Sequence, residues 1–158
     1  MVTPAEPRVR TRAIRGATTV DRDDPALIAD AVREMLGAIV AENVLATENV
    51  VSAMFTMTPD LRSVFPASAA RAMGWSDVPM MCASEIDVAG AQPRCIRVML
   101  HVERAVTAPP VRHVYLREAV ALRPDLCRGA QEHAVEQCDV QESEMQESEM
   151  LAAVAGAV

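Results

Sequence analysis

The residues of this chain best suited to chemistry are its arginines, because all fifteen basic residues are Arg and none is Lys. The planar guanidinium group binds carboxylates through paired hydrogen bonds, so these residues can hold a substrate that carries carboxylate groups. Two of them, Arg15 and Arg97, stand at the end of or within apolar, strand-like segments. Judged by its local sequence alone, each could equally be a solvated Arg at the end or on the exposed face of a strand.

Other kinds of chemistry have no motif in the chain. The four cysteines form no CxxC pair, which favours free thiols in a reducing cytoplasm. His101, His113 and His133 lack the spacing to acids or thiols that is typical of metal ligands, so we expect no metal site. A Ser/His/Asp enzyme is also not indicated, because the sequence has no nucleophile motif.

The net charge of −7 is concentrated near the C-terminus. Residues 127–158 contain seven acids and a single Arg, whereas the rest of the chain is close to neutral. An acidic tail repels phosphate groups, which argues against binding to nucleic acid or to an anionic membrane surface. The first ten residues have no apolar run, and no stretch approaches the roughly 20 apolar residues of a membrane span. We therefore expect no signal peptide, no transmembrane helix and a cytoplasmic location.

Two helices are predicted from local signals. Asp24-Pro25 is a typical helix start, and apolar residues follow it at helical spacing as far as Val40. A shorter helix begins at Pro66 and ends before Gly74. We predict helices over 25–43 and 66–73, and strands over 9–14, 49–56, 78–83, 95–102 and within 111–122.

The order of these elements, β-α-β-α-β-β-β, predicts an α+β fold. It gives a mixed five-stranded sheet with one long and one short helix, and Gly16 with Thr18-Thr19 is expected to turn the chain after the first strand. One long helix covers only one face of such a sheet. Because the strands are largely apolar, the other face must also be buried, which indicates self-association.

Three regions are expected along the chain. Residues 1–8 are predicted to be a disordered lead, residues 9–126 hold the elements of the fold, and residues 127–158 form an acidic tail outside the core. The tail repeats QESEM twice over 141–150, and an interaction segment remains an alternative interpretation of this repeat.

A set of short segments, spread over about residues 12–126, matches one known family in order and at nearly the same spacing. The segments are 14–20 (IRGATTV), 58–61 (TPDL), 64–67 (VFPA), 74–75 (GW), 78–79 (VP), Cys82, Glu85, 87–88 (DV), 95–98 (CIRV), 112–116 (RHVYL) and 122–126 (LRPDL). Together they resemble the non-helical, trimeric class of chorismate mutases.

This resemblance implies a fold and a reaction. The family has a mixed five-stranded sheet with helices around it, and three copies form a barrel-like trimer with active sites in the clefts between subunits. The implied enzyme is an isomerase that performs the Claisen rearrangement of chorismate to prephenate in Phe and Tyr biosynthesis. The reaction needs no cofactor, and the expected partners are chorismate, prephenate and further copies of the same chain, with no nucleic acid and no membrane.

The resemblance also assigns roles to individual residues. Arg97 is expected to direct its guanidinium group at the ether oxygen of chorismate, and Arg15 to bind a substrate carboxylate. Glu85 and Cys82 would contact the ring hydroxyl, and Tyr115 would lie beside a carboxylate. Other expected substrate-binding residues are the pocket walls and the basic residues near the mouth of the site: Phe65, Ala67, Leu122, Arg71 and Arg123. A core position for the apolar residues and a surface position for the charged ones are the structural alternatives.

Some positions depart from the family pattern. Ser68 stands where relatives often have Lys, Met80-Met81 replaces smaller residues, and one residue is missing around 72–74. The tail is also longer than in relatives, and we hypothesise that it gates the cleft. Unchanged kcat and KM in a protein truncated after Leu126 would rule this out. Two other functions stay open: a non-catalytic trimeric binding protein, and a structural or regulatory partner that acts through its tail.

Overall fold

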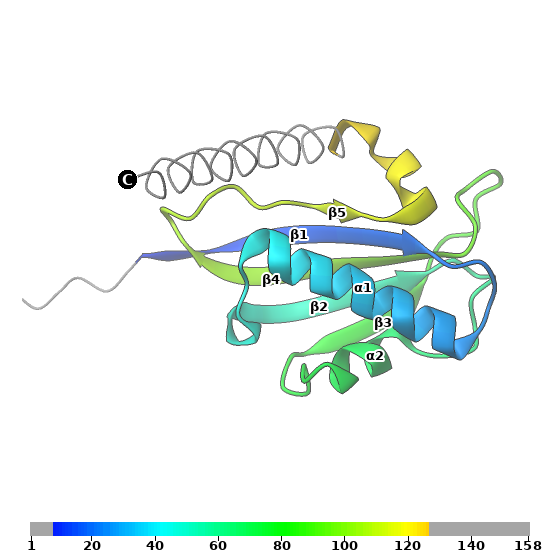
Figure 1. The fold of residues 1–158 in the computed structure, drawn as a ribbon, viewed down its shortest axis with the longest axis horizontal. Helices are drawn as coiled ribbons and strands as arrows, with labels where there is room; N and C mark the ends of the chain where they lie inside the picture. The colour runs from blue at the N-terminus through cyan, green and yellow to red at the C-terminus, as the bar shows by residue number, and fades with distance from the viewer. Residues whose placement is uncertain (1–7, 127–158) are drawn as a thin grey trace, which may run out of the picture. The chain divides into compact units, whose positions relative to one another are not determined.

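The computed structural model describes residues 8–126, and its centre is a five-stranded mixed sheet (Figure 1). The strands are β1 (Val9–Thr19), β2 (Val50–Met57), β3 (Met80–Ser84), β4 (Cys95–Ala105) and β5 (Val114–Tyr115), in the spatial order β3-β2-β4-β1-β5. β4 pairs antiparallel with both β1 and β2, whereas β5 pairs parallel with β1 and β3 pairs parallel with β2. The predicted α+β class is therefore confirmed.

Within residues 8–123, two α-helices and two short 3₁₀ helices accompany the sheet. They are α1 (Pro25–Asn43), α2 (Pro66–Ala72) and the 3₁₀ segments Thr47–Asn49 and Arg117–Leu122. None of the helices in residues 8–126 has the length and apolar character needed to cross a bilayer. The unit that holds the whole sheet extends to Arg123. The predicted acidic tail and nearly all of the predicted lead lie outside the described residues, so the proposed division of the chain stays a prediction.

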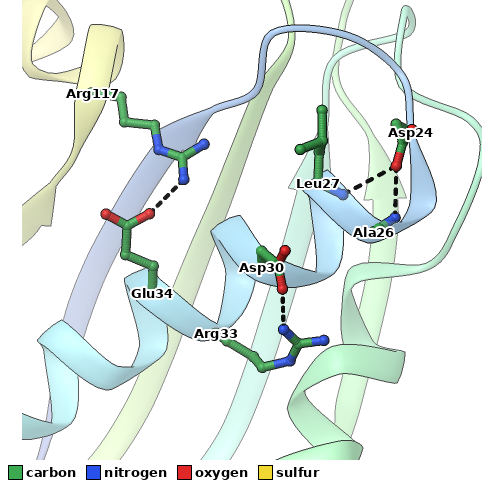
Figure 2. Close-up of polar contacts among 7 residues, drawn as sticks. All are labelled: Asp24, Ala26, Leu27, Asp30, Arg33, Glu34 and Arg117. Carbon is green, nitrogen blue, oxygen red and sulfur yellow. Dashed lines mark hydrogen bonds and ion pairs between the residues drawn. The ribbon is translucent and has the colours of Figure 1, made fainter.

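Helix α1 begins at the residue that its capping signal predicts. Oδ1 of Asp24 accepts hydrogen bonds from the main-chain N–H groups of Ala26 at 2.9 Å and Leu27 at 3.2 Å (Figure 2). The hydrogen bonds from Leu27 and Ala26 hold the pKa of Asp24 below its ordinary value. Near the middle of α1, Glu34 accepts a 2.6 Å hydrogen bond from Arg117, which connects α1 to the last 3₁₀ helix (Figure 2). The cap thus sets where α1 begins, and the ion pair adds one exposed contact between α1 and the last 3₁₀ helix.

Alternation along the strands decides which side chains α1 covers. The buried side of the helix packs against the even-numbered residues of β1 and β4, which form the core of the protein. The core residues with no exposed surface include Ile28, Val32, Met35, Leu36 and Ile39 from α1, and Ile14, Phe55, Ile96, Leu100 and Val102 from the sheet. The odd-numbered residues of β1 and β4 point to the opposite face, because successive side chains alternate across a strand.

The first strand is longer than predicted, because Gly16 and Thr18-Thr19 continue β1 instead of turning the chain. The β-branched Thr residues favour extended backbone. Gly16 serves a different purpose, the close approach of α1: a Cβ atom there would lie 2.6 Å from Cδ1 of Ile39 and 3.0 Å from Cγ1 of Val98. β4 also extends beyond its predicted end, to Ala105, and the other predicted elements lie within a few residues of their observed bounds.

Substitution of Gly16 by Val should destabilise the protein, because the new side chain would occupy the space of Ile39 and Val98. We expect the free energy of unfolding to fall by about 1–3 kcal/mol, the usual cost of overpacking a core. A matched control is Gly37→Ala in the exposed part of α1, where a Cβ would meet no atom within 4 Å. This control should gain about 0.5–1 kcal/mol. Urea unfolding measures both, and a Gly16→Val protein as stable as the wild type would contradict the close packing of α1 on β1.

Candidate functional site

Arg15 and Arg97 line the same hollow, on the sheet face opposite α1. This arginine hollow has a volume of about 410 Å³. Its lining residues are Arg15, Gly16, Ala17, Met54, Thr56, Arg97, Val98, Met99, Tyr115, Leu122 and Arg123. Five site residues predicted from the sequence, drawn from distant parts of the chain, are thus brought together.

The strand register explains why these residues meet. Ala17 of β1 lies opposite Arg97 of β4 on one side and opposite Tyr115 of β5 on the other. Arg97 in turn lies opposite Thr56 of β2. Paired residues on neighbouring strands present their side chains to the same face, so Tyr115, Arg97 and Thr56 form one row across the sheet.

Glu85, which follows β3, holds the guanidinium group of Arg97. Its Oε1 lies 3.3 Å from Nε of Arg97 and accepts a 2.6 Å hydrogen bond from the hydroxyl of Thr56. The main-chain N–H of Glu85 donates to the carbonyl of Met57 at 2.9 Å, which fixes the residue at the end of β2. The contact with Arg97 is an ion pair without hydrogen-bond geometry, and Nε forms no hydrogen bond with any of the described residues. Glu85 therefore orients Arg97, and because Nε is buried, only the terminal nitrogens of the partly exposed guanidinium group can reach a ligand.

The surroundings of Arg97 keep it charged. Partial burial acts to lower the pKa of Arg97, but a hydrogen bond with the Cys95 side chain and the nearby charge of Glu85 help to hold the pKa above its ordinary value. Burial raises the pKa of the neighbouring Cys95 thiol, which therefore stays neutral. The side chain of Arg97 is 41% exposed and that of Glu85 is 14% exposed. A fixed positive charge at the edge of a partly dry hollow suits the binding of an anion or of an oxygen that gains electron density.

Arg15 is held by a residue that the sequence analysis did not assign to the site. Its main-chain N–H donates a 3.1 Å hydrogen bond to Nδ1 of His113, which precedes β5. Burial, together with the nearby charges of Arg15 and Arg123, lowers the pKa of His113. Thr56 and His113 thus support the residues of the hollow. The sequence around each of them does not indicate these contacts.

A second hollow, of about 450 Å³, lies around Phe65 and holds another group of predicted residues. The lining of this Phe65 hollow includes Phe65, Ser68 and Cys82, and the Phe65 side chain is 70% exposed. Cys82 lies opposite the core residue Phe55 on β2 and is only partly buried. Within one chain, the predicted site residues are therefore divided between two hollows.

Three predicted residues line neither hollow: Glu85, which contacts Arg97, and Ala67 and Arg71. Ala67 is 4% exposed and belongs to the core, and Arg71 lies on the exposed side of α2. Within residues 8–126, no group of three His, Cys, Asp or Glu side chains is placed to hold a metal ion. The arginine hollow offers a set of cations and a phenol, with the Glu85 carboxylate beside Arg97, an arrangement suited to binding and orienting a dianion.

The loop that carries the Phe65 hollow is anchored by Asp23. Oδ1 of Asp23 accepts hydrogen bonds from the main-chain N–H groups of Arg62 and Ser63, both at 3.1 Å. A side-chain hydrogen bond from Ser63 and the main-chain bond from Arg62 lower the pKa of Asp23. The carboxylate thus fixes the backbone just before Phe65.

The chain is similar to known proteins in both sequence and structure. Residues 11–126 match the family model described as chorismate mutase type I. The chorismate mutase AroH of Bacillus subtilis (strain 168) is 47% identical over 116 residues, which cover 73% of this chain and 91% of that protein. The chorismate mutase AroH of Thermus thermophilus is also 47% identical over 116 residues, covering 73% of this chain and 95% of that protein. A solved chorismate mutase structure from Clostridium thermocellum superposes with a TM-score of 0.66 at 41% identity, covering 70% of this chain and 98% of that one.

Removal of the Asp23 carboxylate should loosen the loop before Phe65 and lower the melting temperature. Because the pKa of Asp23 is lowered in the folded state, its stabilising effect is complete above its ordinary pKa of 3.8 and is lost as the pH falls below that value. The melting-temperature difference between wild type and Asp23→Ala should therefore shrink between about pH 5 and about pH 3. Asp21→Ala, which removes an exposed acid two residues earlier, is the control and should change little. A difference that persists unchanged at low pH would contradict the anchoring role.

Proposed function

The chain belongs to the chorismate mutase type I family and is a chorismate mutase; on this premise, we propose that two copies of the chain build each active site and that Arg97 stabilises the transition state. The observation that carries the proposal is the Arg97–Glu85–Thr56 cluster in a hollow that Arg15 and Tyr115 also line. The product, prephenate, places the enzyme in the biosynthesis of Phe and Tyr.

The reaction explains why so few residue types are needed. Chorismate rearranges through a chair in which the ether C–O bond breaks while a C–C bond forms. No proton is transferred and no nucleophile attacks, so the enzyme has to restrain a flexible dianion and stabilise the ether oxygen as it gains electron density. Preorganised cations in a partly dry site meet both needs.

Five residues that line the arginine hollow, and Glu85 beside it, have a proposed part in this process. Arg97, oriented by Glu85, donates hydrogen bonds to the ether oxygen, and Glu85 accepts one from the ring hydroxyl. Arg15 binds a carboxylate with Tyr115 beside it. Leu122 forms a wall, and Arg123 at the mouth attracts the dianion. These roles need a positive charge that does not vary with pH, and a guanidinium group supplies it.

We propose that the Phe65 hollow of a neighbouring copy completes each site. Phe65 is an aromatic residue that is 70% exposed in one chain, and Met54, Met81 and Met99 are 44%, 66% and 39% exposed. The three Met residues lie side by side in the strand register, in the row that also contains Arg15. An apolar row of this kind calls for a covering partner. A homotrimer, the assembly that the family resemblance implies, would cover the Met row and bring the Phe65 hollow of a neighbouring copy to the substrate.

The neighbouring copy would contribute the remaining predicted contacts. Cys82 would reach the ring hydroxyl, and Phe65 would form the facing wall. Arg71 would add positive charge at the mouth, whereas the buried Ala67 would shape the wall indirectly. Ser68 lines this hollow without a charge, which predicts weaker substrate binding than a Lys there would give. Free thiols at Cys82 and Cys95 support a cytoplasmic location for the enzyme.

Loss of the Arg97 guanidinium should abolish most of the activity. We expect kcat of Arg97→Ala to fall by about 100-fold or more, the usual effect of removing one preorganised donor to a developing negative charge. The decrease in chorismate absorbance measures the rate. The control is Arg33→Ala, an exposed Arg on α1 paired with Asp30, which should retain wild-type kinetics. A kcat within about threefold of wild type for Arg97→Ala would contradict the proposed role.

A shared site can be tested by mixing two inactive variants. Arg97→Ala damages the arginine hollow, and Phe65→Asp places a negative charge in the facing wall; each alone should be nearly inactive. Trimers assembled from equal amounts of both should regain activity in about one site in four, because that fraction receives both intact halves. The wild type should have a mass close to three times 17.0 kDa in solution. A mixture no more active than its components would show that each site lies within a single chain.

A further inference from the structure

Strand β5 carries Tyr115 to the arginine hollow but is too short to fix its own position. It consists of Val114 and Tyr115, which pair with Gly16 and Ala17 of β1. One further ladder bond, from the N–H of Leu116 to the carbonyl of Ala17 at 2.9 Å, follows the strand. A two-residue strand at a sheet edge needs other contacts to hold its register.

Two side chains, those of Asn43 and His113, supply these contacts in the segment just before β5. Asn43, the last residue of α1, accepts from the N–H of Arg112 at 2.8 Å and donates to the carbonyl of Arg112 at 2.9 Å. Asn43 is 2% exposed, so these bonds are shielded from water. At the next residue, Nδ1 of His113 accepts the main-chain N–H of Arg15 at 3.1 Å. The imidazole therefore takes the place of a main-chain acceptor at the start of the β1–β5 ladder.

We propose that His113 is a positioning residue for chorismate binding: its neutral Nδ1 holds the backbone of Arg15 and thereby fixes Arg15 relative to Tyr115. This inference rests on the carboxylate-binding role proposed above for these two residues. A bond made equally with bound substrate and with the transition state lowers KM and leaves kcat unchanged. The positioning effect should therefore appear in KM.

The charges around His113 predict the direction of its pH dependence. Arg15 of β1 and Arg123 after the last 3₁₀ helix both face it, and the adjacent Arg112 pairs with Glu42 of α1 at 3.5 Å. Protonation would remove the acceptor at Nδ1 and add a third positive charge beside Arg15 and Arg123. Burial and these arginines lower the pKa of His113, so the bond is intact at neutral pH and is lost as the pH falls well below the ordinary value of 6.5. Folding stability should fall in the same direction, because the unfolded chain then binds more protons.

Three substitutions separate positioning from general structural support. Asn at position 113 places its amide oxygen near the position of Nδ1, whereas Gln places its oxygen near that of Nε2, and Leu has no acceptor. We expect KM for chorismate to rise about threefold to tenfold in His113→Gln and His113→Leu, the range expected for the loss of one hydrogen bond, with kcat nearly unchanged. His113→Asn should bind chorismate nearly as well as wild type.

The pH profile and the tautomer provide independent readouts. Wild-type KM should rise as the pH falls well below the ordinary His pKa of 6.5, and this rise should be absent in His113→Asn. It should persist in His101→Asn, which alters a histidine bonded to Ser52 on the same sheet face. In protein labelled with nitrogen-15 at histidine, NMR at neutral pH should show the Nε2–H tautomer of His113.

Equal KM values for His113→Gln and wild type, or a proton on Nδ1 at neutral pH, would overturn the inference. A different result would refute the proposed function: a wild-type protein that does not convert chorismate, whatever the tautomer of His113. An active wild type with an unaffected Gln variant would refute only the positioning role.

Discussion

The proposed catalysis depends on one contact, the ion pair between Arg97 and Glu85 at the edge of a hollow in the sheet. Glu85 is itself held by the hydroxyl of Thr56 at 2.6 Å and by the main chain of Met57, so the carboxylate has little freedom. A guanidinium group placed against such a carboxylate loses much of its rotational freedom before any substrate arrives. Nε is buried beside Glu85 while the side chain is partly exposed, so the terminal nitrogens are the donors that a substrate can reach. Preorganisation of this kind is what a rearrangement without proton transfer can use.

The fold supplies this contact through the alternation of its strands. The even-numbered residues of β1 and β4 pack under α1, and the absence of a side chain at Gly16 lets the helix approach closely. The same alternation sends Arg15 and Arg97 to the other face, where Met54, Met81 and Met99 are also exposed. A face that combines exposed apolar residues with two arginines is costly in an isolated chain, and this explains why catalysis and self-association are coupled in the proposed function.

Local signals in the sequence were sufficient for the helices and insufficient for the site. The start and end of α1 follow from its cap and its apolar spacing, both of which are read within one segment. The extension of β1 through Gly16 was missed because it depends on α1, which packs against the strand from a later segment. The roles of Thr56 and His113 were missed for a similar reason: their partners lie 29 and 98 residues away in the chain. Family resemblance predicts Arg15, Glu85, Arg97 and Tyr115 as site residues. That Arg15, Arg97 and Tyr115 line one hollow follows from strand register, which no single segment reveals.

The most direct test of the central claim is a crystal structure of the protein with a bicyclic dicarboxylate ether that mimics the rearranging chair. Our account predicts that the ether oxygen lies within about 3 Å of a guanidinium nitrogen of Arg97, the usual hydrogen-bond distance. It also predicts that Glu85 still contacts Arg97 and that Phe65 of a neighbouring copy faces the ligand. A ligand bound away from Arg97, or an Arg97 that turns to bulk water when the ligand binds, would contradict the account.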